Sequence, residues 1–364
     1  MKILIVTPAA SQVHTGNQVT TLRWQGILRD LKHRVSIAGR YRRQSCDLLV
    51  ALHARRSADS IERFRREHPQ RPLVVALTGT DLYRDIHHSA SAQRSLELAS
   101  RLIVLQPDGT RQLPEALQGK ACVIYQSVKI DQPRSPLANG IFEVCVIGHL
   151  RSEKDPFRAA RAARRLPTSS RARIVQLGAA LTSDMDQQAR AEMDANPRYQ
   201  WLGEVPRREA LRRLARSRLM VLSSTLEGGA NVLCEAIAAS VPVLSSRISG
   251  SVGILGEDFP GYFPVGDTGA LVKLLQRAEE DGGFYRILRQ WSERLAPLVE
   301  PARERRSWQE LLGELESRGK AGKGGRLQAR EGVRFRNLGS RFLSLQPEAF
   351  ETSKLAIVEA IALC

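Results

Sequence analysis

One unit recurs along the sequence: a short run of apolar, largely β-branched residues followed by a stretch of helical character. Six runs precede residue 126: ILIV (3–6), VSIAG (35–39), LLVAL (48–52), LVVAL (73–77), LIVL (102–105) and CVIY (122–125). Six more follow residue 140: FEVCVIG (142–148), ARIVQLG (172–178), YQWLGEV (199–205), LMVLSS (219–224), VPVLSS (241–246) and GYFPV (261–265). Buried strands alternating with helices are typical of βαβ units and parallel sheets. The sequence therefore predicts an α/β protein.

The stretch KIDQPRSPLANG separates the two sets of runs, and its two prolines and lack of periodicity indicate a linker. A chain of 364 residues also exceeds the usual size of one hydrophobic core. We expect two doubly wound domains with a ligand cleft at the carboxyl ends of their strands: residues 1–130 and 141–318, joined by a linker at 131–140. Residues 319–364 are basic, have no assigned role, and are interpreted as either an unstructured appendage or an unrelated extension of the reading frame.

Cysteine and histidine usage argues against a metal or a disulfide framework. The five cysteines are scattered and never at CxxC spacing, and the seven histidines form no HExxH pair. No apolar run approaches the roughly 20 residues needed to span a bilayer. The opening MKILIVTPAASQV predicts a first strand and not a signal peptide, so we expect a cytoplasmic protein.

A formal net charge of +17 permits nucleic acid, an acidic membrane surface or small anionic substrates as partners. An aromatic content of 5% weakens the nucleic-acid interpretation, because single-stranded nucleic acids stack on aromatic side chains. Much of the excess is arginine in helical stretches such as RAARAARR, which is typical of a solvated face.

The stretch TLEGGANVLCEAIAASVPVL, residues 225–244, predicts a strand exit, a glycine turn and a short helix. Asn231 is a favourable N-cap residue, and the amides from Ala230 to Leu233 would form a helix N-terminus able to bind an anion. Glu227 and Glu235 can accept hydrogen bonds from sugar hydroxyls on either side of a bound diphosphate. By spacing alone, a tight turn with two surface glutamates is an equally good interpretation.

This E-x7-E pattern, followed by a small-residue helix and VPVL, resembles the signature of the group 1, retaining-type glycosyltransferases of the GT-B fold. LTGTDLY, VIGHLRSEKDPF and WLGEV stand in the order of that family's other motifs, over about residues 1–315. The resemblance implies two Rossmann-like domains facing a central cleft, with Glu227 facing the transferred sugar and Glu235 holding the ribose of the nucleotide.

The resemblance also implies a set of donor contacts. Lys154 matches the family's lysine and would pair with the diphosphate, His149 replaces its usual arginine, and Arg151 would restore the missing charge. The implied donor-binding residues are His149, Arg151, Lys154, Val205, Gly228, Gly229, Ala230, Asn231, Val232, Leu233 and Glu235. No metal or cofactor is expected, because cations and helix amides would stabilise the leaving diphosphate.

SQVHTGNQVTTLRW, ALHARRSADS and ALTGTDLYRDI, taken with the donor motifs, resemble the selenosugar synthases of selenoneine biosynthesis. Those enzymes join a UDP-sugar, UDP-N-acetylglucosamine or UDP-glucose, to selenophosphate. YQSVK, where the family usually has PNGVD, agrees with a more anionic acceptor. Glu227 is the catalytic residue that the resemblance implies, and His53 and Asp81 are predicted beside it because each could steer a proton or position the nucleophile. The predicted acceptor-binding residues are His14, Gly16, Asn17, Arg55, Arg56, Thr80, Gln126 and Lys129.

Three alternatives remain open at this stage. Arg55 and Arg56 also fit a solvated helix start. The acceptor of a conventional glycosyltransferase would be a hydroxyl of a glycan or lipid. A basic nucleic-acid-binding protein on a degenerate GT-B fold would account for the charge, and its affinity would fall steeply with salt. Retention at the anomeric carbon is implied by the resemblance alone.

Overall fold

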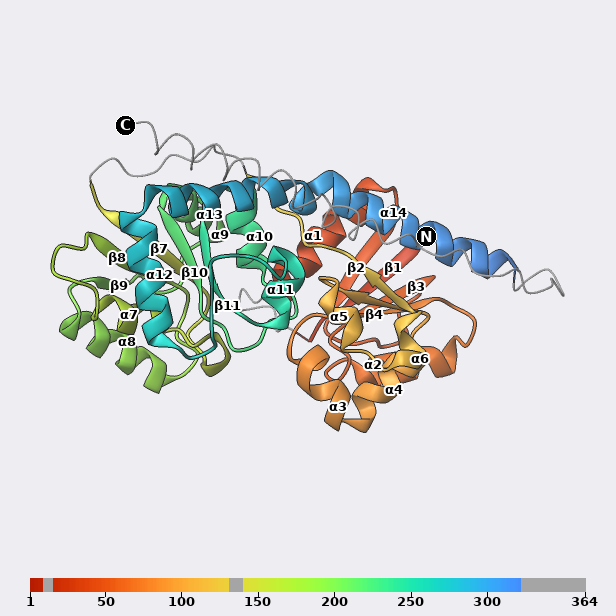
Figure 1. Ribbon diagram of the computed structural model, residues 1–364. Helices are drawn as coiled ribbons and strands as arrows, with labels where there is room; N and C mark the ends of the chain where they lie inside the picture. The colour runs from red at the N-terminus through yellow and green to blue at the C-terminus, as the bar shows by residue number, and fades with distance from the viewer. Residues whose placement is uncertain (9–15, 131–139, 322–364) are drawn as a thin grey trace, which may run out of the picture. The chain divides into compact units, whose positions relative to one another are not determined.

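The computed structural model describes residues 1–8, 16–130 and 140–321 and contains two six-stranded parallel sheets (Figure 1). The first has the order β2-β1-β3-β4-β5-β6, and the second β12-β11-β10-β7-β8-β9. Every predicted strand is present, which confirms the α/β prediction. The strands of the first sheet are β1 (Lys2–Val6), β2 (Arg34–Ala38), β3 (Leu48–Leu52), β4 (Leu73–Leu77), β5 (Arg101–Val104) and β6 (Ala121–Val123). Those of the second are β7 (Phe142–Ile147), β8 (Ala172–Leu177), β9 (Tyr199–Trp201), β10 (Leu219–Leu222), β11 (Val243–Ser246) and β12 (Tyr262–Phe263).

Helices cover both faces of the first sheet, so its central strands β3 and β4 are buried along their whole length. Ile61 and Phe64 of α2 pack on one face, together with Leu96 of α4. Trp24 and Leu28 of α1 pack on the other face. The helical segments of this domain are α1 (Gly16–Asp30), α2 (Ala58–Glu67), the π-helical turn η1 (Asp81–Asp85), α3 (Ile86–His88), α4 (Ala90–Leu98), α5 (Asp108–Arg111) and α6 (Glu115–Gln118).

The second sheet lies in one continuous apolar core with the helices around it. Side chains cap several of these helices: Thr182 begins α8 and Asp267 begins α12 in this way. The helical segments are the 3₁₀ turn η2 (Ser152–Lys154), α7 (Arg158–Ala163), α8 (Ser183–Ala195), α9 (Arg207–Arg216), α10 (Asn231–Ala238), α11 (Ser249–Leu255), α12 (Thr268–Glu280), α13 (Gly282–Leu295), the 3₁₀ turn η3 (Ala296–Val299) and α14 (Pro301–Ala321).

The chain crosses between the two cores in ways that differ from the predicted boundaries. Tyr125 and Val128, placed in the first domain by the sequence, pack in the second core. Helix α14, placed in the second domain, returns to the first and buries Trp308 and Leu312 against the side of its sheet that carries α1 (Figure 1). The predicted linker at 131–140 and tail at 319–364 fall almost entirely outside the described residues.

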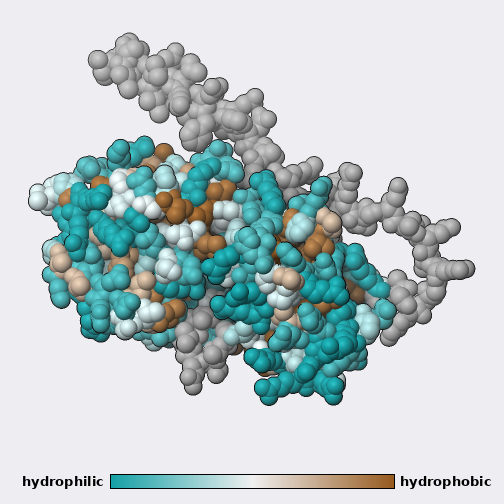
Figure 2. Space-filling model, turned by 90° about the horizontal axis from the view of Figure 1, so that it is seen from below, coloured by the Kyte–Doolittle hydropathy of each residue, from teal (hydrophilic) through white to brown (hydrophobic). Residues whose placement is uncertain are grey.

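The arginine excess lies largely at the surface. The face drawn in Figure 2 is mostly hydrophilic, with a few separate apolar patches. Many exposed arginines pair with a carboxylate one helical turn away, as in Arg190–Asp186 and Arg289–Glu293. Such pairs contribute little stability and are typical of a solvated face, as the sequence predicts for most of the charge.

Candidate active site

The candidate site lies where the strand order of the second sheet reverses. From β7 the chain adds β8 and β9 on one side of that strand, and β10, β11 and β12 on the other. Ligands of open α/β sheets bind outside the carboxyl ends of the strands at such a point. The segments that follow β7 and β10 carry Lys154 and Glu227, so the fold brings together two residues predicted for donor binding and catalysis.

Lys154 and Glu227 form an ion pair between Nζ and Oε1, and their side chains are 19% and 11% exposed. The Ser224 hydroxyl donates a second hydrogen bond to Glu227 Oε1 at 2.7 Å. The Thr225 amide donates to the Glu153 carbonyl at 2.9 Å, which ties the two loops together. Lys154 therefore presents a fixed positive charge at the reversal point.

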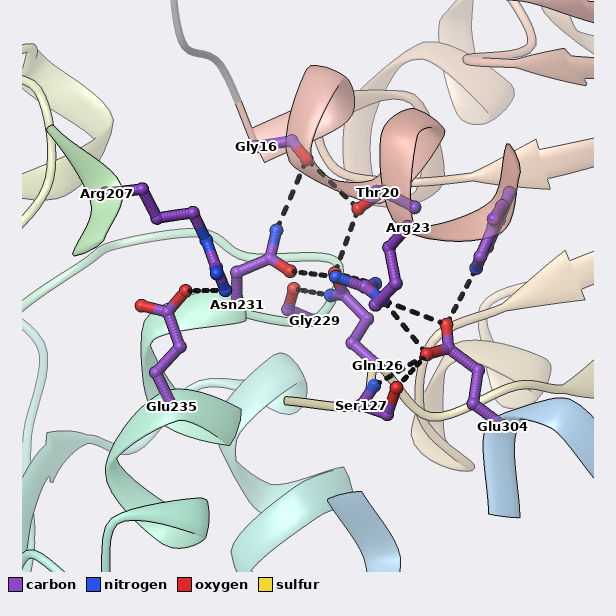
Figure 3. Close-up of polar contacts among 11 residues, drawn as sticks. Gly16, Thr20, Arg23, Gln126, Ser127, Arg207, Gly229, Asn231, Glu235 and Glu304 are labelled. Carbon is purple, nitrogen blue, oxygen red and sulfur yellow. Dashed lines mark hydrogen bonds and ion pairs between the residues drawn. The ribbon is translucent and has the colours of Figure 1, made fainter. Parts of the chain in front are cut away.

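Helix α10 begins one residue earlier than a capping role for Asn231 requires. The N-cap residue is Ala230, which has no side chain able to cap, and Asn231 is the first helical residue. The predicted N-cap was therefore wrong. The side-chain amide of Asn231 donates to the Gly16 carbonyl at 3.3 Å, and its Oδ1 accepts from Arg23 Nη1 at 3.2 Å (Figure 3).

The sequence predicts an anion-binding site at the backbone N–H groups of the first turn of α10. Leu233 N–H already donates to the Ala230 carbonyl at 3.0 Å, so its amide belongs to the helix ladder. The amides of Asn231 and Val232 precede that ladder, as the first N–H groups of any α-helix do. Ala230, Val232 and Leu233 are buried residues, which confines access to the backbone at this turn.

Glu235 is 7% exposed and lies one turn along α10. It forms an ion pair with Arg207 at the start of α9, with Nη2 2.7 Å from Oε1 (Figure 3). Sequence reasoning missed Arg207, although it follows the predicted WLGEV element by only two residues. Val205 packs against the second core. Beside it, a hollow of about 480 Å³ opens at the ends of β8 and β9; its lining comprises Ala179, Ala180, Leu181, Thr182, Ser183, Asp186, Trp201, Gly203 and Glu204.

His149 and Arg151, the other donor-binding residues predicted in the loop after β7, differ in their surroundings. His149 accepts a hydrogen bond at Nδ1 from the Ala179 amide, at 3.1 Å, and so connects the ends of β7 and β8. Arg151 is exposed. His149 is half-buried, so Arg151, three residues before Lys154 in the chain, is the more exposed of the two.

Gly228 and Gly229 lie against the first domain. A Cβ at Gly228 would lie 2.6 Å from the Thr78 carbonyl carbon and 2.7 Å from the Gly79 nitrogen. A Cβ at Gly229 would lie 2.6 Å from the Leu105 Cβ. These contacts require glycine, because real Cβ atoms do not approach so closely. They place the turn of residues 228–231, called the donor turn for its predicted role, against the loop that follows β4.

His53, at the end of β3, is the centre of a buried polar cluster. Its backbone has a φ of 72°, in the left-handed region, and the residue is 3% exposed. The Arg56 amide donates to Nδ1 at 3.3 Å, which assigns the proton of the neutral ring to Nε2. Nε2 lies 3.4 Å from the Thr80 hydroxyl and 3.8 Å from Asp85 Oδ2. Burial lowers the pKa of His53, although Asp81 opposes the shift.

Asp81 is fully buried and accepts three backbone hydrogen bonds. Oδ1 accepts from the amides of Thr78 at 3.2 Å and Gly79 at 2.9 Å, and Oδ2 accepts from the amide of Ala54 at 3.0 Å. These bonds hold the loops after β3 and β4 together. Asp81 therefore acts here through the backbone it fixes.

Arg55 and Arg56 are exposed, and Arg55 Nε lies 3.4 Å from Asp85 Oδ2. Both precede helix α2, which begins at Ala58. Asp85 was missed, yet it lies four residues after Asp81 in TGTDLYRDI, the spacing of one helical face. The π-helical turn η1 holds both aspartates, and such turns occur frequently at functional sites.

The other predicted acceptor residues are distributed differently. Gln126 is 1% exposed; its oxygen accepts from Thr20 and Arg23, and its amide donates to the Gly229 carbonyl at 2.5 Å. Gly16 contacts Asn231 at the start of α1, while Lys129 is exposed. Asn17 is half-buried and its carbonyl accepts from Thr21. His14 lies outside the described residues.

Within the described ranges, no group of three or more histidine, cysteine, aspartate or glutamate residues could hold a metal ion. Among the helices of those ranges, none is long and apolar enough to cross a membrane.

His53 predicts a measurable pH dependence of stability. The pKa of His53 is lowered from 6.5 in the folded protein, so the unfolded chain binds more protons below pH 6.5. The free energy of unfolding therefore decreases as the pH is lowered below 6.5. His53→Gln should make the fall between pH 6.5 and 5 shallower, by at most about 1.4 kcal/mol per pH unit. Urea denaturation at several pH values measures the slope, and His88→Gln, at an exposed position, is the control. Equal slopes in wild type and His53→Gln would contradict the assignment.

The chain is similar to known proteins in sequence and in fold. Residues 127–294 match the family model described as Glycosyl transferases group 1. A search of curated proteins finds no match. Among solved structures, Anabaena Alr3699/HepE in complex with UDP and glucose is 16% identical, with a TM-score of 0.69 over 86% of this chain and 100% of that one.

Two further structures have the same fold. Sucrose-phosphate synthase from Thermosynechococcus elongatus is 15% identical, with a TM-score of 0.72 over 87% of this chain and 99% of that one. A glycosyltransferase from Rickettsia africae is 13% identical, with a TM-score of 0.69 over 86% and 98%. The chain therefore has the GT-B fold, and its residues 127–294 are similar to the group 1 glycosyltransferases.

Proposed function

We propose that the protein transfers a sugar from a UDP-sugar to a small selenium anion, selenophosphate, and releases UDP. The observation that carries the donor half is the Lys154–Glu227 pair, which lies at the strand reversal of the second sheet beside the first turn of α10. A lysine and a helix N-terminus on one side of a site, with carboxylates beside them, suit a sugar diphosphate.

The donor contacts follow from the positions of these groups. Lys154, Arg151 and the amides of α10 take the diphosphate, Glu235 takes the ribose hydroxyls, and Glu227 faces the transferred sugar. The hollow beside Val205 takes the uracil base. Support comes from the family match, and from HepE, whose solved structures include complexes with UDP and with UDP-glucose.

In the proposed reaction the bond between the anomeric carbon and the diphosphate oxygen breaks, with oxocarbenium character at carbon. Lys154 and the α10 amides stabilise the negative charge on the departing UDP, so the reaction has no requirement for a resident metal. Selenium uses a lone pair to form the new carbon–selenium bond, with retention at the anomeric carbon. Water then cleaves the selenium–phosphorus bond and releases phosphate and the selenosugar. The selenophosphate anion is already ionised and needs little general-base assistance.

The acceptor assignment rests on the cluster at the end of β3. Arg55 and Arg56 are exposed cations, and arginine suits phosphate oxygens. His53 and Asp81 fix the loops that carry Arg55 and Thr80, and the Thr78–Gly79 segment of the second loop touches Gly228 of the donor turn. The resemblance of the N-terminal motifs to selenosugar synthases supports selenophosphate over a sugar hydroxyl.

Incubation with UDP-N-acetylglucosamine or UDP-glucose and selenophosphate tests the proposal. We expect a selenosugar by mass spectrometry, with UDP and phosphate released in equal amounts. Omission of selenophosphate should stop UDP release above hydrolysis. Release of UDP only with glycan or lipid hydroxyl acceptors would overturn the selenium assignment. Binding to duplex DNA at physiological salt without binding to UDP would overturn the enzyme assignment as well.

Glu235→Ala should weaken UDP binding by about 10-fold, because the ribose hydroxyls lose a charged acceptor. The uridine diphosphate analogue that lacks both ribose hydroxyls should bind the wild type and this variant equally. Calorimetric titration with the two nucleotides measures the difference. Arg207→Met, which removes the partner of Glu235 in the free protein, serves as the comparison. A Glu235→Ala variant that still distinguishes the two nucleotides as the wild type does would exclude the ribose role.

A further inference from the structure

A buried carboxylate on α14 is bound to the first domain close to the donor turn. Glu304 has a fully buried side chain; its two oxygens accept from Arg23 Nε at 2.9 and 3.2 Å. The Trp24 indole donates to Oε1 at 2.8 Å, and the amide and hydroxyl of Ser127 donate to Oε2 (Figure 3). A buried charge with this many donors is well compensated.

Arg23, whose side chain is 14% exposed, carries the network to the donor turn. Its Nη1 donates to Asn231 Oδ1 at 3.2 Å, and its Nη2 donates to Gln126 Oε1 at 3.0 Å. Gln126 in turn donates to the Gly229 carbonyl. One guanidinium therefore fixes the turn twice, through the Asn231 side chain and, by way of Gln126, through its backbone (Figure 3).

The same contacts explain why Asn231 does not cap its own helix. Both polar atoms of its amide are bound to α1, at Gly16 and Arg23. Ala230 at the N-cap position supplies no capping oxygen. The backbone N–H groups of Asn231 and Val232 are thus left to other acceptors, while the turn itself is held by residues outside the helix.

We propose that Arg23, with Glu304 as its counter-ion, is a positioning residue that holds the Gly229–Asn231 turn in the geometry that binds the diphosphate. The inference rests on the proposed function for the identity of the anion. Arg23 touches the turn and not the substrate. Its planar guanidinium reaches three acceptors at once, an arrangement that a lysine ammonium does not reproduce.

Arg23→Met tests the inference by binding measurements. We expect the Kd for UDP to rise about tenfold, because the diphosphate contacts the turn, and the Kd for uridine to stay unchanged. The matched control is Arg101→Met, which breaks the Arg101–Glu314 pair between α14 and the same domain away from α10. Arg101→Met should lower the melting temperature and leave both Kd values unchanged. Equal loss of UDP binding in the two variants would overturn the proposal.

A double-mutant cycle with Asn231→Ala tests the route of the effect. If Arg23 acts partly through Asn231, Arg23→Met should weaken UDP binding less in the Asn231→Ala background than in the wild type. Equal effects of Arg23→Met in the two backgrounds would show that Arg23 does not act through Asn231.

Hydrogen exchange distinguishes failure of this inference from failure of the proposed function. Peptides covering residues 228–234 should exchange faster in Arg23→Met and Glu304→Gln than in Arg101→Met, with no ligand present. If the wild type does not bind UDP, the proposed donor is wrong, and this exchange pattern alone decides whether Arg23 holds the turn. Identical exchange in all three variants would overturn the positioning role.

Discussion

Lys154→Met is expected to lower kcat for UDP release by about 10²–10³-fold, the effect of removing one preorganised group that stabilises a developing negative charge. The substitution also leaves the Glu227 carboxylate, 11% exposed, without its cationic partner. An unpaired carboxylate beside the leaving diphosphate opposes the charge that forms there. Steady-state kinetics with saturating acceptor measures the loss.

The control for Lys154→Met is Arg213→Met in the same domain. Arg213 pairs with Glu143, which is 4% exposed, with Nε 2.9 Å from Oε1. Loss of that pair should destabilise the fold, because it leaves a buried carboxylate with fewer partners. It should leave kcat unchanged. Wild-type kcat in Lys154→Met, or an equal loss in both variants, would exclude the proposed role of Lys154.

Gly228→Ala is expected to abolish most transfer activity through one added methyl group. Its Cβ would lie 2.6 Å from the Thr78 carbonyl carbon and 2.7 Å from the Gly79 nitrogen, and neither backbone atom can rotate away. Overpacking of this kind costs about 1–3 kcal/mol or displaces the backbone. Displacement moves Glu227, the neighbouring residue, and separates the donor turn from the loop fixed by Asp81.

Gly26→Ala is the matched control for Gly228→Ala. Gly26 lies inside α1 with nothing within 4 Å of an added Cβ. The substitution should stabilise the protein by about 0.5–1 kcal/mol, because alanine is the better helix former. Melting temperature and kcat are measured for both variants. Full activity in Gly228→Ala would show that the two domains need not approach as closely as the structure has them.

The sequence was sufficient for the strands and for part of the site. Strands buried on both faces form continuous apolar runs, so each was visible locally. Lys154 and Glu227 were predicted because VIGHLRSEKDPF and the E-x7-E stretch resemble motifs of the group 1 glycosyltransferases, and the structure places both residues after strands of one sheet. Asp85 was within reach of reasoning from spacing, since four residues separate it from Asp81 on one helical turn.

Contacts made at long range were not predictable. The Asn231 error arose because capping preferences are local, whereas the partners of this side chain lie on α1. Glu304 pairs with Arg23 across 281 positions of sequence, and no periodic pattern connects them. The sequence predicts that Glu235 binds a ligand, but in the free protein its carboxylate forms an ion pair with Arg207. The E-x7-E stretch was thus visible in the sequence, and the long-range partners of its residues were not.

The return of α14 has a consequence for biosynthesis. Trp308, Leu311, Leu312 and Leu315 complete the core that Trp24 and Leu28 begin, so this core lacks one wall until the ribosome has passed residue 315. Among residues 1–8, 16–130 and 140–321, the core of the second sheet draws on none later than Val299. The domain that is translated first is therefore the last to close. Its apolar face stays exposed while the second domain folds, and this interval is when the nascent chain is most prone to aggregation and most dependent on chaperones.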